Sequence, residues 1–105
     1  MKELNKKNFE EEVLGSDKAV LVDFWSPSCE PCKDLITHVE KLEKKYGEDI
    51  KFTSLDITKA RRLAIRQKIL SIPEIAIYKE GEKIESVIGE EATAESVEEL
   101  IEKHA

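Results

Sequence analysis

Apolar residues along the chain fall into short continuous runs separated by stretches with helical spacing. Residues 19–25 form a nearly continuous apolar run, which indicates a strand buried on both faces. Residues 50–57 form a second run of this kind. Between them, Leu35, Val39, Leu42 and Tyr46 recur at helical spacing until Gly47, which predicts an amphipathic helix. The pattern therefore alternates strands with helices.

The remaining segments complete this alternation. Asn8 is expected to be the N-cap of a first helix that ends near Gly15, with acidic residues in its first turn. A short helix is expected over residues 59–68, and two strands over residues 75–78 and 83–88 are joined by a hairpin at 79–82. A final helix begins at Thr93, and a short extra strand is expected near residues 2–4. The apolar positions expected to face inward on the two later helices are Leu63, Ala64, Ala94, Val97, Leu100 and Ile101.

This order predicts an α/β fold with a central mixed sheet and helices on both faces. Strands separated by helices run parallel through right-handed crossovers, and the hairpin adds an antiparallel edge. We expect a single domain over residues 1–105. The working site of such sheets lies at the carboxyl ends of the central strands, just past Trp25 here.

Composition narrows the classes of function. The chain is 38% charged and 40% apolar, with a net charge of −6, which disfavours binding to nucleic acid and to anionic membranes. No apolar run approaches the ~18 residues needed to span a bilayer, and the N-terminus lacks the apolar core of a secretory signal. We therefore expect a cytoplasmic protein, and nothing in the sequence suggests an obligate oligomer.

The cysteines carry the candidate chemistry. Cys29 and Cys32 follow the first long strand and open a helix, where the dipole favours thiolates, so a disulfide that forms and breaks is the simplest interpretation. A metal site is not expected, because His38 and His104 are the only imidazoles and are not placed to converge on the cysteines. A purely structural disulfide would close a very short loop and remove little chain entropy.

The chain resembles the thioredoxin family over essentially its whole length. Residues 20–25 followed by Cys29-Glu30-Pro31-Cys32-Lys33 are similar to the strand and active-site loop of that family. Residues 71–73 resemble its cis-proline loop, residues 78–82 its hairpin, and Ile88-Gly89 a further loop beside the disulfide.

The resemblance implies specific roles. Cys29 would attack a substrate disulfide, Cys32 would resolve the mixed disulfide, and Asp23 would carry a proton beneath them. Pro73, in cis, would face the disulfide. The redox-active disulfide would serve in place of a cofactor. The residues implied to contact substrate are Trp25, Ser28, Glu30, Pro31, Ile72, Glu74, Gly89 and Glu90.

Several positions depart from the family. Ser28 stands where tryptophan is usual, while Glu30, Glu74 and Glu90 stand where glycine, threonine and a small residue are common. These acids are either neutral drift or an acidic rim that favours partners with a basic docking patch.

Ser54 stands where some relatives carry a lysine near the buried acid. We therefore expect burial to raise the pKa of Asp23 without a compensating cation.

The leading hypothesis is a cytoplasmic protein disulfide reductant, re-reduced by thioredoxin reductase or an equivalent dithiol donor. A thioredoxin-fold oxidant or isomerase is an alternative, although the Glu30-Pro31 dipeptide lacks the histidine common in those relatives. A binding subunit whose dithiol is incidental is a third. The C-E-P-C sequence with a non-aromatic residue before it also resembles thioredoxins that serve glycine reductase in anaerobic amino-acid-fermenting bacteria.

Overall fold

The computed structural model describes residues 1–105, which form a five-stranded mixed sheet. The strands are β1 (Lys2–Leu4), β2 (Val20–Trp25), β3 (Lys51–Asp56), β4 (Glu74–Lys79) and β5 (Glu82–Ile88), in the spatial order β1-β3-β2-β4-β5. Strands β1, β3 and β2 are parallel, whereas β4 and β5 are antiparallel to their neighbours. The predicted mixed sheet, including the short first strand, is confirmed.

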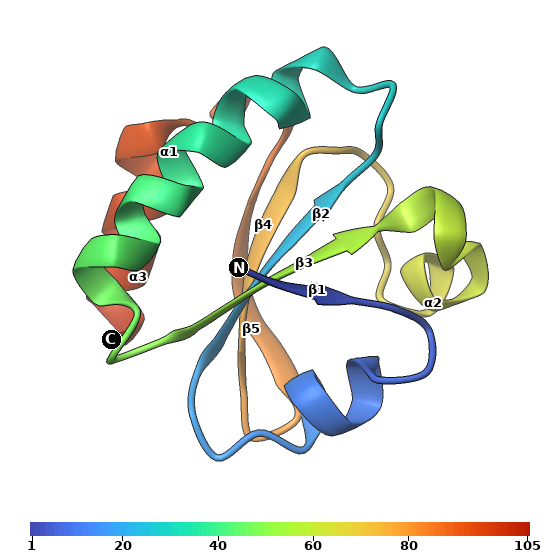
Figure 1. Ribbon diagram of the computed structural model, residues 1–105, viewed down its shortest axis with the longest axis horizontal. Helices are drawn as coiled ribbons and strands as arrows, with labels where there is room; N and C mark the ends of the chain where they lie inside the picture. Colours follow the sequence, from blue (N-terminus) through green and yellow to red (C-terminus); the bar gives the residue numbers. More distant parts are fainter.

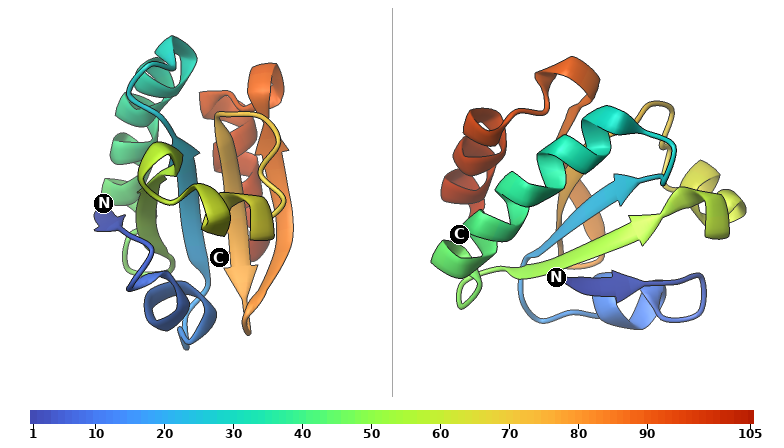
Figure 2. Two further views of the ribbon diagram at one scale, coloured as in Figure 1. Left: turned by 90° about the vertical axis from the view of Figure 1, so that its right-hand side faces the viewer. Right: turned by 45° about the horizontal axis from the view of Figure 1, so that its top comes forward.

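Helices cover both faces of this sheet (Figures 1 and 2). Helices α1 (Glu30–Tyr46) and α3 (Ala94–His104) pack on one face, over a core that includes Leu21, Val39 and Ile101. The short helix α2 (Arg61–Arg66) and the π-helical turn η1 (Glu10–Leu14) cover the other face, over a core that includes Val22 and Tyr78. This arrangement confirms helices on both sides of the sheet.

Strand register sets the position of the cysteine loop. In the parallel pair β2 and β3, Trp25 lies opposite Asp56 and Asp23 lies opposite Ser54. Both strands therefore end at the same edge of the sheet, and the chain passes from β2 through a short loop into α1 at that edge (Figure 1). As the sequence predicted, the cysteines lie at the carboxyl ends of the central strands.

The β4–β5 hairpin forms at the predicted position. Lys79 pairs with Glu82, so Glu80 and Gly81 form a two-residue turn, and their φ angles are +52° and +82°. Positive φ at both central residues defines a type I′ turn, whose twist matches that of the flanking strands. Glycine provides one of these conformations without steric cost.

Two helix predictions need correction at their starts. Asn8 is not an N-cap, because η1 begins at Glu10 and the preceding turn is capped by Asn5. The Asn5 side-chain oxygen accepts hydrogen bonds from the backbone N–H groups of Lys7 and Asn8, while the Asn8 side chain accepts one from Asn5. Asparagine is a favourable N-cap residue, and the sequence has one at position 5 and one at position 8, so the sequence alone does not decide between them.

The helix predicted over residues 59–68 is divided into two pieces. A 3₁₀ turn, η2 (Ile57–Lys59), is capped by the Asp56 carboxylate, and α2 starts only after Ala60, whose extended φ of −150° interrupts the helix. Lys68, at φ +61°, follows the end of α2. Leu63 and Ala64 are buried as predicted, but Ala94 in α3 is only half-buried because it lies in the first turn.

Candidate active site

Cys29 and Cys32 are joined in a disulfide at the N-terminus of α1. Cys29 is the N-cap residue, and its sulfur accepts a hydrogen bond of 3.2 Å from the backbone N–H of Cys32. Cys32 is buried, at 1% exposure, whereas Cys29 is partly exposed. Pro31 lies in the first helical turn, where a missing N–H costs no hydrogen bond. The N-terminal N–H groups and the helix dipole therefore stabilise a thiolate on the more accessible sulfur.

Asp23 is fully buried on the same face of the sheet as α1. It lies opposite Ile75 of β4, which belongs to the core under α1 and α3. Neither of its carboxylate oxygens has a hydrogen-bond partner within the chain. Its neighbour across the ladder is Ser54, so no cation compensates, and burial raises the pKa of Asp23 from 3.8 to about 7. The expected raised pKa is confirmed in direction and cause.

The peptide bond between Ile72 and Pro73 is cis, as expected for this loop. Pro73 is buried and Ile72 half-buried. The Pro73 carbonyl accepts a hydrogen bond of 2.8 Å from the N–H of Gly89. Gly89 has φ +61°, a conformation that glycine adopts readily, and a side chain there would meet strain. This contact brings the loop after β5 beside the loop before β4.

A groove of about 510 Å³ lies next to the disulfide, and its lining includes Pro31, Pro73, Gly89 and Glu90. Glu90 is exposed, and so is Glu30, whose carboxylate lies 3.6 Å from the Lys33 ammonium. The other predicted contact residues also line the cysteine loop: Trp25 is half-buried at the end of β2, and Ser28 is exposed with its hydroxyl 3.3 Å from that of Ser26.

The chain matches the thioredoxin family model over residues 1–103. It is 55% identical to a thioredoxin of Acetoanaerobium sticklandii over 104 residues, covering 99% of each chain. It is 45% identical to a thioredoxin of Peptoclostridium acidaminophilum, covering 97% of this chain and 93% of that one. The chain belongs to the thioredoxin family. The crystal structure of Malassezia sympodialis thioredoxin superposes with a TM-score of 0.90 at 28% identity, covering 99% of this chain and 90% of that one.

Family membership and the disulfide together define the chemistry. Thioredoxins are protein disulfide reductases that work by dithiol–disulfide exchange, and the Cys29–Cys32 pair is the redox centre of this one. The partners of the family are thioredoxin reductase and disulfide-containing proteins. No cluster of three or more potential metal ligands occurs in the chain. The helices lack the length and apolar character that crossing a membrane requires.

The prediction that Glu74 belongs to an acidic rim is wrong. Glu74 is 1% exposed, and it pairs opposite Phe24, on the α2 face of the sheet rather than the α1 face. Its carboxylate lies 2.7 Å from the ammonium of Lys83, which also donates a 2.7 Å hydrogen bond to the carbonyl of Gln67. Strand alternation explains the correction, because neighbouring residues of β4 point to opposite faces. Of the three acids predicted near the disulfide, only Glu30 and Glu90 are exposed.

Two features of this thioredoxin were not found by sequence reasoning. Lys83, the partner of Glu74, gave no signal, because one lysine in a hairpin strand is unremarkable. The second feature is a basic surface over η2 and α2, and here a signal existed. No acidic residue occurs between Asp56 and Glu74, although the chain as a whole carries a net charge of −6.

Proposed function

We propose that Cys29 is the attacking nucleophile and Cys32 the resolving thiol. The Cys29 thiolate attacks one sulfur of a substrate disulfide, that bond breaks, and the first substrate thiolate leaves. The Cys32 thiolate then attacks Cys29, which displaces the second substrate thiolate and forms the Cys29–Cys32 disulfide. The chain gives up two electrons and the substrate gains them. The observation that carries this order is the unequal exposure of the two sulfurs at the helix N-terminus.

We infer that Asp23 accepts the proton that the Cys32 thiol loses during the second step. A carboxyl group whose pKa is about 7 exchanges protons readily near neutral pH. Its burial without a hydrogen-bond partner leaves both oxygens free to take that proton. Asp23 and the cysteines of the reduced protein are expected to titrate together. The pKa values measured there therefore describe the three residues jointly and not any one of them.

Reduction of insulin disulfides by dithiothreitol tests these roles. The wild-type chain should accelerate the reaction, and Cys29→Ser should abolish the acceleration. Asp23→Asn should slow product release more than initial attack, so a burst of mixed disulfide should accumulate. Acceleration that persists in Cys29→Ser would overturn the proposed order of attack, and an unchanged rate with no such burst in Asp23→Asn would remove Asp23 from the mechanism.

The proposed docking surface comprises the groove beside Pro31 and Pro73 and the exposed carboxylates Glu30 and Glu90. Its charge fits a reductase or substrate that carries a basic docking patch, because complementary charge speeds association. Raising the ionic strength should slow the association of such a partner with this surface.

Several finer expectations stay predictions: a single domain over residues 1–105, a monomer, a cytoplasmic location and service to glycine reductase. Gel filtration tests the monomer, and limited proteolysis the single domain. Cell fractionation tests the location, and coupled turnover with purified glycine reductase tests the last.

A further inference from the structure

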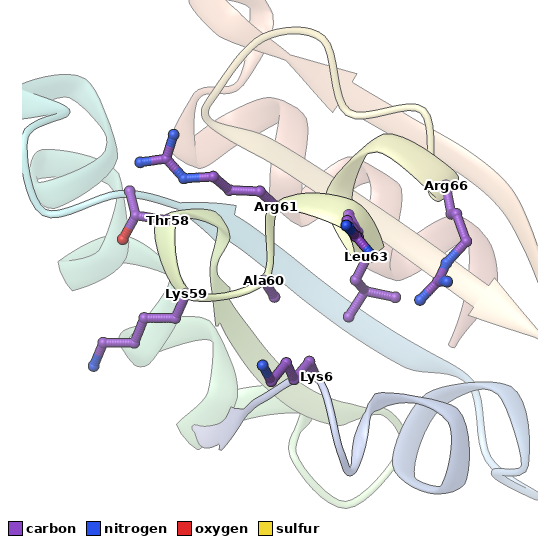
Figure 3. Close-up of a pocket in the computed structure, with 8 residues that line it drawn as sticks. Lys6, Thr58, Lys59, Ala60, Arg61, Leu63 and Arg66 are labelled. Atoms are coloured by element: carbon purple, nitrogen blue, oxygen red, sulfur yellow. The ribbon is translucent and has the colours of Figure 1, made fainter.

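A second charged groove lies on the α2 side of the molecule. This groove, hereafter the basic groove, has a volume of about 510 Å³. Five cationic side chains line it: Lys6, Lys59, Arg61, Arg62 and Arg66. Figure 3 shows Lys59, Arg61 and Arg66 extending from the η2–α2 segment, with Lys6 approaching from the loop after β1. All five residues are exposed.

The basic groove is not neutralised within the chain. None of its five cations takes part in an ion pair, whereas lysines elsewhere, such as Lys51 and Lys103, are paired with carboxylates. The arginines of the chain, moreover, all lie in α2. Unpaired cations gathered in a protein of net charge −6 create a local positive potential that attracts an anionic group.

The basic groove adjoins the active site. Lys59 also lines a smaller groove of about 260 Å³ together with Trp25 and Pro27 of the cysteine loop. This adjacency follows from strand register, because β2 and β3 end together and η2 begins directly after Asp56. Two acids, Glu3 and Asp56, also line this smaller groove. The Asp56 carboxylate accepts hydrogen bonds from the backbone N–H and the hydroxyl of Thr58.

The opposite flank of the disulfide carries the opposite charge. The groove beside Pro31 and Pro73 is also lined by Asp34, Glu90 and Glu95, and none of these acids forms an ion pair. The redox centre therefore lies between an acidic flank and a basic flank. A partner that spans both would be oriented by charge as well as attracted.

Apolar side chains complete the basic flank. Leu70 is 94% exposed in the loop leading to Pro73, and Ile65 is 72% exposed on α2. Arginine and apolar anchors together are typical of protein interfaces, whereas a nucleic acid would meet the strong negative charge of the rest of this chain. The composition of the surface thus favours a protein partner.

We propose that the basic groove docks an acidic segment of the partner protein whose disulfide or dithiol reacts at Cys29. This inference rests on the proposed function, because it assumes that exchange begins at the partly exposed Cys29. The groove would hold carboxylates of the partner, while Leu70 contacts an adjacent apolar residue. The acidic flank would at the same time exclude acidic partners that approach in the reverse orientation.

Synthetic disulfide peptides test the proposal with defined probes. Three peptides share one intramolecular disulfide, and they carry four serines, four aspartates before the disulfide, or four aspartates after it. At low ionic strength, the reduced wild-type protein should reduce one of the two acidic peptides about tenfold faster than the serine peptide. Added salt should remove the difference.

Matched variants separate the groove from net charge. Arg61→Gln/Arg66→Gln should lower the rate of reduction of the faster acidic peptide to that of the serine peptide. Lys41→Gln/Lys44→Gln, exposed residues of α1 with the same change in net charge, should leave its advantage unchanged. Circular dichroism of both double variants should show folded protein.

Four outcomes would overturn the proposal. Equal rates for all three peptides, with reduction proceeding, would remove the docking role and leave the proposed function intact. Equal losses in both double variants would reduce the effect to net charge. Tighter binding of a fluorescent single-stranded oligonucleotide than of the acidic peptide would assign the groove to nucleic acid. Reduction of none of the peptides would contradict the proposed function itself, and this inference with it.

Discussion

Asp23 lies directly opposite Ser54 in the β2–β3 ladder, and neither carboxylate oxygen of Asp23 finds a hydrogen-bond partner within the chain. Burial therefore acts alone on this acid and raises its pKa to about 7. Asp23 lies on the face of the sheet that α1 covers, and α1 carries the disulfide at its N-terminus. The ionisation of Asp23 should be visible in both stability and turnover.

The stability of the oxidised protein should fall as the pH rises from about 4 to about 7. The folded chain holds the Asp23 proton more tightly than the unfolded chain, in which the pKa is near 3.8. Protonation therefore favours folding: the contribution is fully present below pH 3.8 and is lost as the pH passes through about 7. At 1.36 kcal/mol per pKa unit, the loss is about 4 kcal/mol. Urea unfolding between pH 4 and pH 8 measures it.

Asp23→Asn is the control for that series. The amide cannot ionise, so its stability relative to the wild type should rise by about 4 kcal/mol from pH 4 to pH 8. A constant difference between the two proteins across this range would show that Asp23 does not carry the raised pKa.

In the reduced protein, limiting iodoacetamide should modify Cys29 before Cys32. Cys29 is partly exposed at the N-cap, whereas Cys32 is 1% exposed inside α1. Peptide mass spectrometry after brief alkylation locates the label. Labelling of Cys32 first would reverse the assigned roles.

Lys83→Met should destabilise the protein by about 3 kcal/mol, because it leaves the carboxylate of Glu74 buried without a partner. Removing both charges in Glu74→Leu/Lys83→Met should recover most of that loss. Urea unfolding at pH 7 measures both variants. If the double variant is as unstable as the single one, the cost comes from lost lysine packing over Phe24 rather than from the charge.

A disulfide peptide with a run of lysines should be reduced several-fold faster than its serine counterpart at low salt. Glu30→Gln/Glu90→Gln should lose most of this advantage, because both carboxylates are exposed near the disulfide. Glu40→Gln/Glu48→Gln changes net charge equally at exposed positions away from the groove and should retain the advantage. If Glu30→Gln/Glu90→Gln still reduces the lysine peptide as much faster than the serine peptide as the wild type does, the two acids are neutral drift.

Much of the fold was predictable because continuous apolar runs and helical spacing each specify one kind of element. The position of Cys29, the environment of Asp23 and the cis bond before Pro73 were all anticipated. Glu74 was misplaced, because the strand was expected to begin at residue 75, whereas β4 begins at Glu74 and directs its side chain to the α2 face.

The starts of short helices were also mistaken, since Asn5 and Asn8 compete as caps and Asp56 starts a separate turn. The basic groove was missed for a different reason: its cations come from two segments, and only the fold brings Lys6 to α2.

Trapping with Cys32→Ser tests the central claim most directly. This variant is reduced and mixed with a protein disulfide substrate, and the covalent complex is isolated under denaturing conditions and mapped by mass spectrometry. The substrate should be attached through a disulfide to Cys29, and Cys29→Ser should trap none. A stable complex through Cys32 in Cys29→Ser, with none in Cys32→Ser, would contradict the assignment of Cys29 as the nucleophile of this thioredoxin-family disulfide reductase.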